Sequence, residues 1–124
     1  MSTRSNIGIL NQDGTVDYIY CHFDGYLDHN GTILNENYNT EEKVRELISL
    51  GNMSVLAETI EHSIFYKRDR KESLKIYKTS YADYTKEYFE EYVYLFTPGK
   101  GWEVREYGIS YWADLNEAVK TKLI

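Results

Sequence analysis

The chain has 124 residues, which is the size of a single domain, so we expect one domain over residues 1–124. Twenty acidic residues against fourteen basic ones give a net charge of −6, which argues against an extended nucleic acid as the partner. The start has no apolar signal core, and no stretch approaches the roughly 18 apolar residues of a membrane helix. We therefore expect a cytoplasmic protein without a membrane partner.

The first two predicted elements are strands over 3–10 and 15–22, joined by the sequence NQDG at 11–14, which is typical of a hairpin turn. Side chains alternate between the two faces of a strand. Both faces of the second strand carry rings or apolar groups, which predicts a central position in the sheet. Paired residue numbers in this hairpin should sum to about 25 or 26. Arg4 is therefore expected to lie close to His22.

The next part of the chain has helical patterns. Apolar side chains within 27–38 predict a short helical stretch. Asn39 and Glu42 fit a capping box, which predicts a helix that ends before Gly51, a natural C-terminal stop. The apolar spacing over 52–61 predicts a further helical turn or two.

The second half of the chain begins with two predicted strands, over 63–67 and 73–79. The charged sequence RDRKE at 68–72 is expected to connect them as a hairpin loop. A helix rich in aromatic residues follows over 81–91.

The chain closes with a predicted hairpin and a helix. Strands over 91–97 and 102–107 flank the turn sequence PGKG at 98–101. Asp114 is expected to cap a final helix with an apolar side formed by Leu115, Ala118, Val119 and Leu123. The fold class is therefore α+β, with a mainly antiparallel sheet of about six strands and helices packed on one face.

The segment CHFDGY at 21–26 contains several residue types that often carry chemistry. His22, Asp24 and His29 are metal-ligand types, but their spacing matches no established metal-binding template, and we assign no metal. Cys21 is the only cysteine, which excludes an internal disulfide and is typical of a buried strand residue. Ser5 could reach His22 as a nucleophile reaches its base, but nothing marks an oxyanion hole. We assign neither catalytic residues nor a cofactor, and whether the protein is an enzyme stays open.

Arg4 is predicted to meet the end of the second strand. Its guanidinium would lie near His22 and Asp24 and near the rings of Tyr20 and Tyr26. Such a cluster suits phosphate or carboxylate, since arginine offers paired donors and the rings offer a stacking surface. An ion pair between Arg4 and Asp24 that only fixes the turn explains the same residues equally well.

A second basic cluster lies in YKRDRKE at 66–72, where Lys67, Arg68, Arg70 and Lys71 surround Asp69. A solvated loop is the simplest explanation. The functional alternative is a clamp for phosphate that closes over a ligand seated on the aromatic sheet.

The stretches MSTRSNIGI, DGTVDYIYCHFDGYLDHNGTIL and NTEEKVRELISLGNMSVL resemble a group of small uncharacterised phage and bacterial proteins. That group has an M-[SG]-T-R-S start, an I-Y-C-H-W-D-G-Y-P segment and a Y-x-R-D-R-x-E segment. The resemblance covers most of the first 72 residues. Phe23 and Leu27 depart from it, standing where the group often has tryptophan and proline. The resemblance implies a compact, often phage-borne protein of the host cytoplasm that counters host immunity.

These observations lead to a hypothesis and its alternatives. The preferred function is to bind and sequester a small phosphorylated, nucleotide-like signalling ligand. The expected ligand-binding residues are Arg4, Ser5, Tyr20, His22, Phe23, Asp24, Tyr26, Arg68 and Arg70. The thirteen tyrosines also suit a protein–protein inhibitor or adaptor that binds a host defence protein. A nucleotide hydrolase that uses His22 and Asp24 is the second alternative, and a homodimer is a reasonable assembly.

Overall fold

The computed structural model describes residues 2–86, 90–109 and 111–122. The strands are β1 (Ser5–Leu10), β2 (Thr15–Cys21), β3 (Met53–Val55), β4 (Ile64–Phe65), β5 (Tyr77–Ser80), β6 (Tyr92–Thr97), β7 (Gly101–Glu106) and β8 (Ala113–Asp114). The helices are α1 (Thr32–Asn37), α2 (Glu41–Ser49), α3 (Tyr66–Arg70), α4 (Tyr81–Lys86) and α5 (Leu115–Lys122), and a π-helical turn η1 (Leu27–Gly31) leads into α1. Together these elements make an α+β domain, as predicted.

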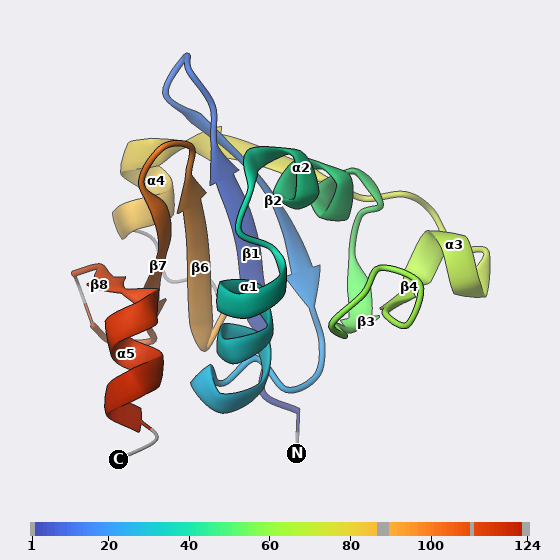
Figure 1. The fold of residues 1–124 in the computed structure, drawn as a ribbon. Coiled ribbons are helices and arrows are strands. Elements are labelled where there is room, and N and C mark those ends of the chain that lie inside the picture. The colour runs from blue at the N-terminus through green and yellow to red at the C-terminus, as the bar shows by residue number, and fades with distance from the viewer. Residues whose placement is uncertain (1, 87–89, 110, 123–124) are drawn as a thin grey trace.

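The strands form one open, mixed sheet in the order β4-β3-β2-β1-β6-β7-β8, and β5 also pairs with β2 (Figure 1). Antiparallel pairing predominates, but β1 runs parallel to β6 and β2 runs parallel to β3. The first hairpin has the expected register, with Ser5 opposite Cys21 and Asn6 opposite Tyr20. The second hairpin, β6 with β7 around residues 98–100, is also confirmed.

Helices cover both faces of the sheet, so the prediction of a single covered face is wrong. The larger core lies where α1, α2 and α5 pack against one face, and Ile7, Ile19 and Leu47 are fully buried within it. On the opposite face, Tyr84 of α4 packs on Val16 with Val93 and Leu95. Val16 and Tyr18 of β2 pack in this second layer, whereas Tyr20 is not part of it.

Residues 52–61 do not form the expected helical turns. Met53 pairs with Cys21 on β2 and with Phe65 on β4, and the backbone N–H of His22 donates to the Met53 carbonyl at 3.1 Å. A short apolar run suits a strand or a helix equally well by its periodicity. The strand forms because the edge of β2 has backbone groups that need partners.

The charged segment 68–72 is not a hairpin loop. Strand β4 pairs with β3 and β5 pairs with β2, so the two strands beside this segment do not pair with each other. Residues 66–70 instead form the single-turn helix α3, where Asp69 Oδ2 accepts the backbone N–H of Phe65 at 2.8 Å. The carboxylate satisfies a donor that the start of a helix leaves open.

Three predicted helix signals can be compared with the structure. Thr40 and not Asn39 caps α2, because its hydroxyl accepts the Lys43 N–H at 3.2 Å. Gly51 ends that helix at a φ of +82°, and Asp114 caps α5 by accepting the Glu117 N–H at 3.0 Å, both as predicted. Residues 87–89 of the predicted helix 81–91, and Leu123, lie outside the described residues.

No helix in the described part of the chain is long and apolar enough to cross a lipid bilayer. Helix α2, for example, has nine residues, against the roughly 20 that a span needs.

Candidate functional site

The edge of β2 is divided between two partner strands, and a gap separates them. Strand β5 pairs with residues 15–18, while β3 pairs at Cys21. The backbone N–H of Tyr20 lies between the two, and the side chain of Asn52 takes the place of a strand by accepting this N–H at 2.9 Å. Asn52 also donates from Nδ2 to the Tyr77 hydroxyl at 3.0 Å. One amide side chain thus ties β2 to β5 across the gap.

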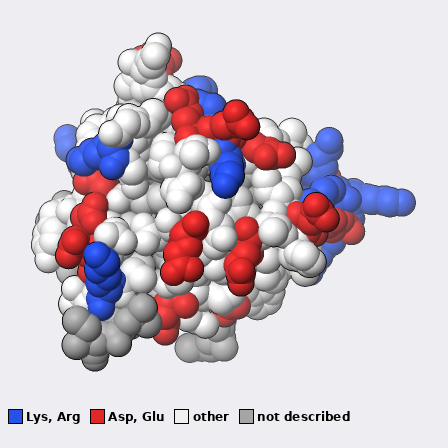
Figure 2. Space-filling view, viewed as in Figure 1, with Lys and Arg blue, Asp and Glu red and all other residues white. Residues whose placement is uncertain are grey.

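A hollow of about 510 Å³ opens beside this gap. We call it the Tyr20 hollow; its lining residues are Tyr20, Asn52, Tyr66, Lys71, Glu72, Ser73 and Lys75. A volume of this order suits a nucleotide-sized ligand. The basic side chains over α3 are visible at the right edge of the molecule in Figure 2.

Backbone contacts fix the outer wall of the Tyr20 hollow. Lys71 has a left-handed φ of +57° and ends α3, which turns the chain back so that the Glu72 N–H donates to the Tyr66 carbonyl at 3.0 Å. Farther along, the Asn52 N–H donates to the Lys75 carbonyl at 3.1 Å. The wall is therefore anchored at both ends, although residues 71–76 are all exposed.

Arg4 lies close to Tyr20, which forms the inner wall of the hollow. Burial raises the pKa of the Tyr20 phenol, and the nearby Arg4 guanidinium opposes this shift. The predicted proximity of Arg4 to the end of β2 is therefore found in the structure. Asp24 is not its partner in any ion pair among the described residues.

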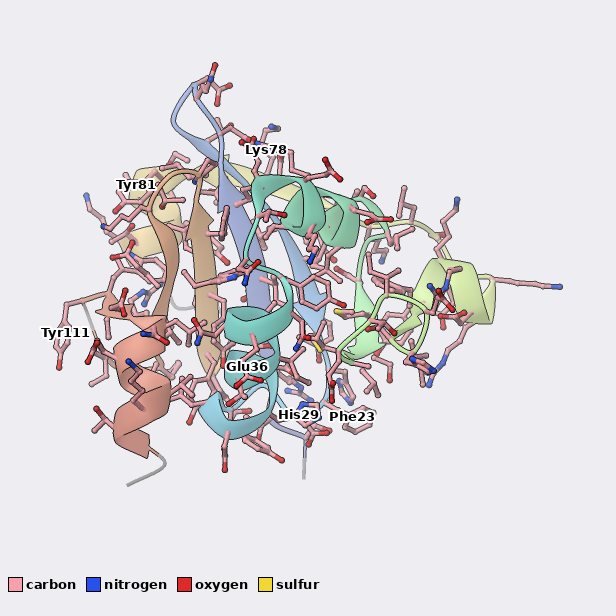
Figure 3. All side chains as sticks on the ribbon, in the orientation of Figure 1. Phe23, His29, Glu36, Lys78, Tyr81 and Tyr111 are labelled. Carbon is pink, nitrogen blue, oxygen red and sulfur yellow. The ribbon has the colours of Figure 1, made fainter. Side chains whose placement is uncertain are left out.

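His22 belongs to the same cluster. Its Nδ1 lies 2.6 Å from the Tyr20 hydroxyl, and its Nε2 lies 3.1 Å from the Ser2 hydroxyl. The edge of its ring meets Phe23 with 4.5 Å between ring centroids. Phe23 is 39% exposed, and Figure 3 shows it near His29 at the end of the sheet closest to the N-terminus. Ser2, which sequence analysis missed, is thus the hydroxyl that contacts this imidazole.

Ser5 and Cys21 lie on the opposite, buried face of the first hairpin, and both are fully inaccessible. The Asn30 side chain donates to the Ser5 hydroxyl at 3.3 Å and to the Cys21 sulfur at 3.4 Å. Burial raises the pKa of the Cys21 thiol to about 11. The cysteine is therefore a core residue, as its strand position predicted, and the structure does not bring Ser5 to the Tyr20 hollow.

Asp24 and Tyr26 shape the corner after β2. Asp24 adopts a left-handed φ of +57°, and its carboxylate accepts a hydrogen bond from the Tyr26 hydroxyl at 3.3 Å. This carboxylate raises the pKa of the Tyr26 phenol. The two residues contact each other rather than the Tyr20 hollow.

Arg68 and Arg70 differ in what surrounds them. The Arg68 guanidinium donates to the carbonyls of Ile60 and Ser63 at 2.9 and 2.6 Å and pairs with Asp69 at 2.9 Å. It holds the loop before β4 in place. The Arg70 guanidinium instead lies over the ring of Tyr66, 5.4 Å from its centroid, but Arg70 itself does not line the hollow.

Of the nine predicted ligand-binding residues, only Tyr20 lines the hollow. Arg4 and His22 lie next to Tyr20, and Arg70 lies over the ring of Tyr66. The remaining five, Ser5, Phe23, Asp24, Tyr26 and Arg68, do not line it. Asn52 and Lys75 were not expected there. No spacing signal marks them, because their roles depend on where β2 changes partners. Among the described residues, no three His, Cys, Asp or Glu side chains form a group that could hold a metal ion.

Comparisons of the chain with protein-family models, with curated proteins and with solved structures give no match.

Replacing Asn52 by alanine should destabilise the protein by about 2–4 kcal/mol, since it leaves the Tyr20 N–H without its acceptor and removes the link to Tyr77. Urea unfolding measures this change. Asn35→Ala is the control, because Asn35 makes an exposed bond to Asn116 and should cost less than about 0.5 kcal/mol. Equal losses in both variants would contradict the bridging role of Asn52.

Proposed function

We propose that this protein binds and sequesters a small phosphorylated, nucleotide-like ligand in the Tyr20 hollow. The observation that carries the proposal is that two tyrosines, Tyr20 and Tyr66, and two lysines, Lys71 and Lys75, line one space of about 510 Å³. Rings bind bases by stacking, and lysines bind phosphates as point charges.

The groups around the hollow divide naturally between the parts of a nucleotide. Lys71 and Lys75 would bind phosphate from the outer wall, and Arg4 would add charge beside Tyr20. The rings of Tyr20 and Tyr66 would carry the base. His22 orients the Tyr20 phenol through the 2.6 Å contact and need not touch the ligand. The Asn52 side chain already accepts the Tyr20 N–H and donates to the Tyr77 hydroxyl. It therefore shapes the hollow rather than contacting the ligand.

Sequestration fits this arrangement better than hydrolysis does. A hydrolase built on His22 and Asp24 needs the two groups to act together, yet His22 contacts Tyr20 and Ser2 while Asp24 contacts Tyr26. Binding alone requires only that the hollow hold the ligand tightly. The resemblance to small phage proteins supports a role in the host cytoplasm, where removal of a signalling nucleotide would blunt an immune response.

Replacing Lys71 or Lys75 by alanine should weaken nucleotide binding about tenfold to a hundredfold, since a hydrogen bond to a charged group contributes about 1.5–3 kcal/mol. Lys67→Ala is the matched control, because Lys67 lies on α3 but does not line the hollow. A thermal-shift screen of mononucleotides and cyclic nucleotides identifies the probe, and isothermal titration calorimetry measures the affinities. Ligand at about 1,000 times its Kd should stabilise the wild type by roughly 4 kcal/mol. A panel without any shift would contradict the proposal.

A second candidate function is inhibition of a host defence protein through an aromatic surface. Tyr107 and Tyr111 are 65% and 68% exposed, and Ile109 between them is 38% exposed. Ile109 and Tyr111 also line a small hollow of about 160 Å³ together with Leu27. Exposed aromatic groups beside an apolar recess are typical of binding surfaces. Tyr111→Ala should abolish capture of such a partner while leaving nucleotide binding unchanged, and sedimentation of the same variant tests this surface as a homodimer contact.

A further inference from the structure

Glu72 is the one acidic residue among those that line the Tyr20 hollow. Its neighbours in the lining include Lys71 and Lys75, yet Glu72 is in none of the ion pairs formed by the described residues. A carboxylate that only balanced the lysines would be expected to pair with one of them. This carboxylate remains available to a ligand.

The backbone holds Glu72 in a defined place. The bond of its N–H to the Tyr66 carbonyl, 3.0 Å long, keeps it beside Tyr66, which lines the same hollow. The left-handed Lys71 immediately before it sets the direction of the chain. A base stacked on Tyr66 would therefore present its edge near Glu72.

The charge of Glu72 limits which part of a nucleotide it can meet. A carboxylate repels phosphate and only accepts hydrogen bonds, so it requires a ligand edge made of donors. Guanine has two adjacent donors on one edge, its ring N1–H and its exocyclic amine, which match the two oxygens of a carboxylate. Adenine places a ring acceptor beside its amine, and this acceptor would face a carboxylate oxygen.

We propose that Glu72 selects a guanine base, so that the ligand class of the Tyr20 hollow is guanine nucleotides. This inference rests on the proposed function, because it assumes that the hollow holds a nucleotide. Lys71 and Lys75, on either side of Glu72 in the sequence, then bind the phosphates of the same ligand.

Calorimetry with matched guanine and adenine ligands tests the inference, using monophosphates, cyclic mononucleotides and cyclic dinucleotides of each base. The wild type should bind the guanine member of a pair about tenfold tighter or more, as expected for a paired contact to a base edge. Glu72→Gln should bring this ratio close to one without weakening adenine binding, since the variant also removes a charge that repels phosphate. Glu61→Gln, at an exposed residue outside the hollow, should leave the ratio unchanged.

The outcomes separate the two proposals. Equal binding of guanine and adenine ligands by the wild type would overturn guanine selection while leaving nucleotide sequestration intact. If Glu72→Gln weakened both ligands equally, Glu72 would be a structural residue and the inference would fail. If no ligand of either base bound, the proposed function and the inference would fail together.

Discussion

Replacing Gly25 by alanine is expected to destabilise the protein by about 3 kcal/mol, because the new methyl group has no room. A Cβ at this position would lie 2.7 Å from Ser5 Cβ, 2.9 Å from the Thr3 carbonyl oxygen and 3.0 Å from the Arg4 carbonyl carbon. Two of these three atoms belong to the backbone, which cannot move aside as a flexible side chain can. Thermal or urea unfolding measures the loss.

The backbone of Gly25 is also held on two sides, so the clash has no easy relief. Its N–H donates to the Thr3 carbonyl at 2.8 Å, and its carbonyl accepts the buried Tyr94 hydroxyl at 2.6 Å. Any shift that accommodates a methyl group must stretch one of these bonds or displace the chain before β1. Because Arg4 lies in that chain, we expect Gly25→Ala to weaken ligand binding as well.

Gly14→Ala is the control that separates a clash from backbone strain. Gly14 has a φ of +87°, which L-residues avoid, but a Cβ there would meet no atom within 4 Å. The expected cost is therefore about 1–2 kcal/mol from conformation alone, with ligand binding unchanged. If Gly25→Ala destabilised the protein no more than Gly14→Ala, the close packing of Gly25 against residues 3–5 would not contribute to stability.

Local signals in the sequence predict the first hairpin and two of the helix ends correctly, while the cap of α2 is Thr40 and not the predicted Asn39. The turn at 11–14 fixes which residues pair, so the proximity of Arg4 to Tyr20 near the end of β2 follows from counting alone. Gly51 and Asp114 are correct for the same reason, since a helix stop or cap depends on a few neighbouring atoms.

The errors concern contacts between distant parts of the chain. Whether Met53 joins a helix or a strand depends on the free edge of β2, which local periodicity does not reveal. The hollow itself exists because β5 and β3 divide that edge and leave Tyr20 between them. Asn52 and Lys75 acquire their positions only once this topology forms. Local signals single out the segment 66–72, of which Tyr66, Lys71 and Glu72 line the hollow, but they mark neither Asn52 nor Lys75.

Alkaline pH is expected to unfold the protein in a steep transition, because several buried groups are kept protonated by the fold. Burial raises the pKa of the Cys21 thiol from 9.0 to about 11, and it raises the pKa values of the Tyr84 and Tyr94 phenols well above 10.0. Between its unfolded and folded pKa values, each group has lost its proton in the unfolded chain and retains it in the folded protein. Raising the pH therefore favours unfolding.

The size of this effect can be bounded from Cys21 alone. A shift of about two pKa units corresponds to roughly 3 kcal/mol, which is present below pH 9 and lost as the pH approaches 11. The two tyrosines add to this loss above pH 10, since both phenols are fully buried. Against a typical stability of about 5–15 kcal/mol, the urea midpoint should begin to fall near pH 9 and drop steeply above pH 10.

Two variants show which groups cause the loss of stability as the pH rises. Cys21→Ala removes the thiol and should flatten the fall between pH 9 and 11, although the cavity lowers stability at neutral pH. Tyr94→Phe keeps the ring but removes the phenol that donates to Gly25, so it should cost about 1 kcal/mol at neutral pH and less than that in alkali. Above pH 10 the Tyr94 phenol ionises in the unfolded wild type, which lowers the stability of the wild type but not that of Tyr94→Phe. The free energies of unfolding of the two proteins should therefore converge above pH 10. Parallel curves for the wild type and both variants would mean that neither the thiol nor the Tyr94 phenol drives the alkaline transition.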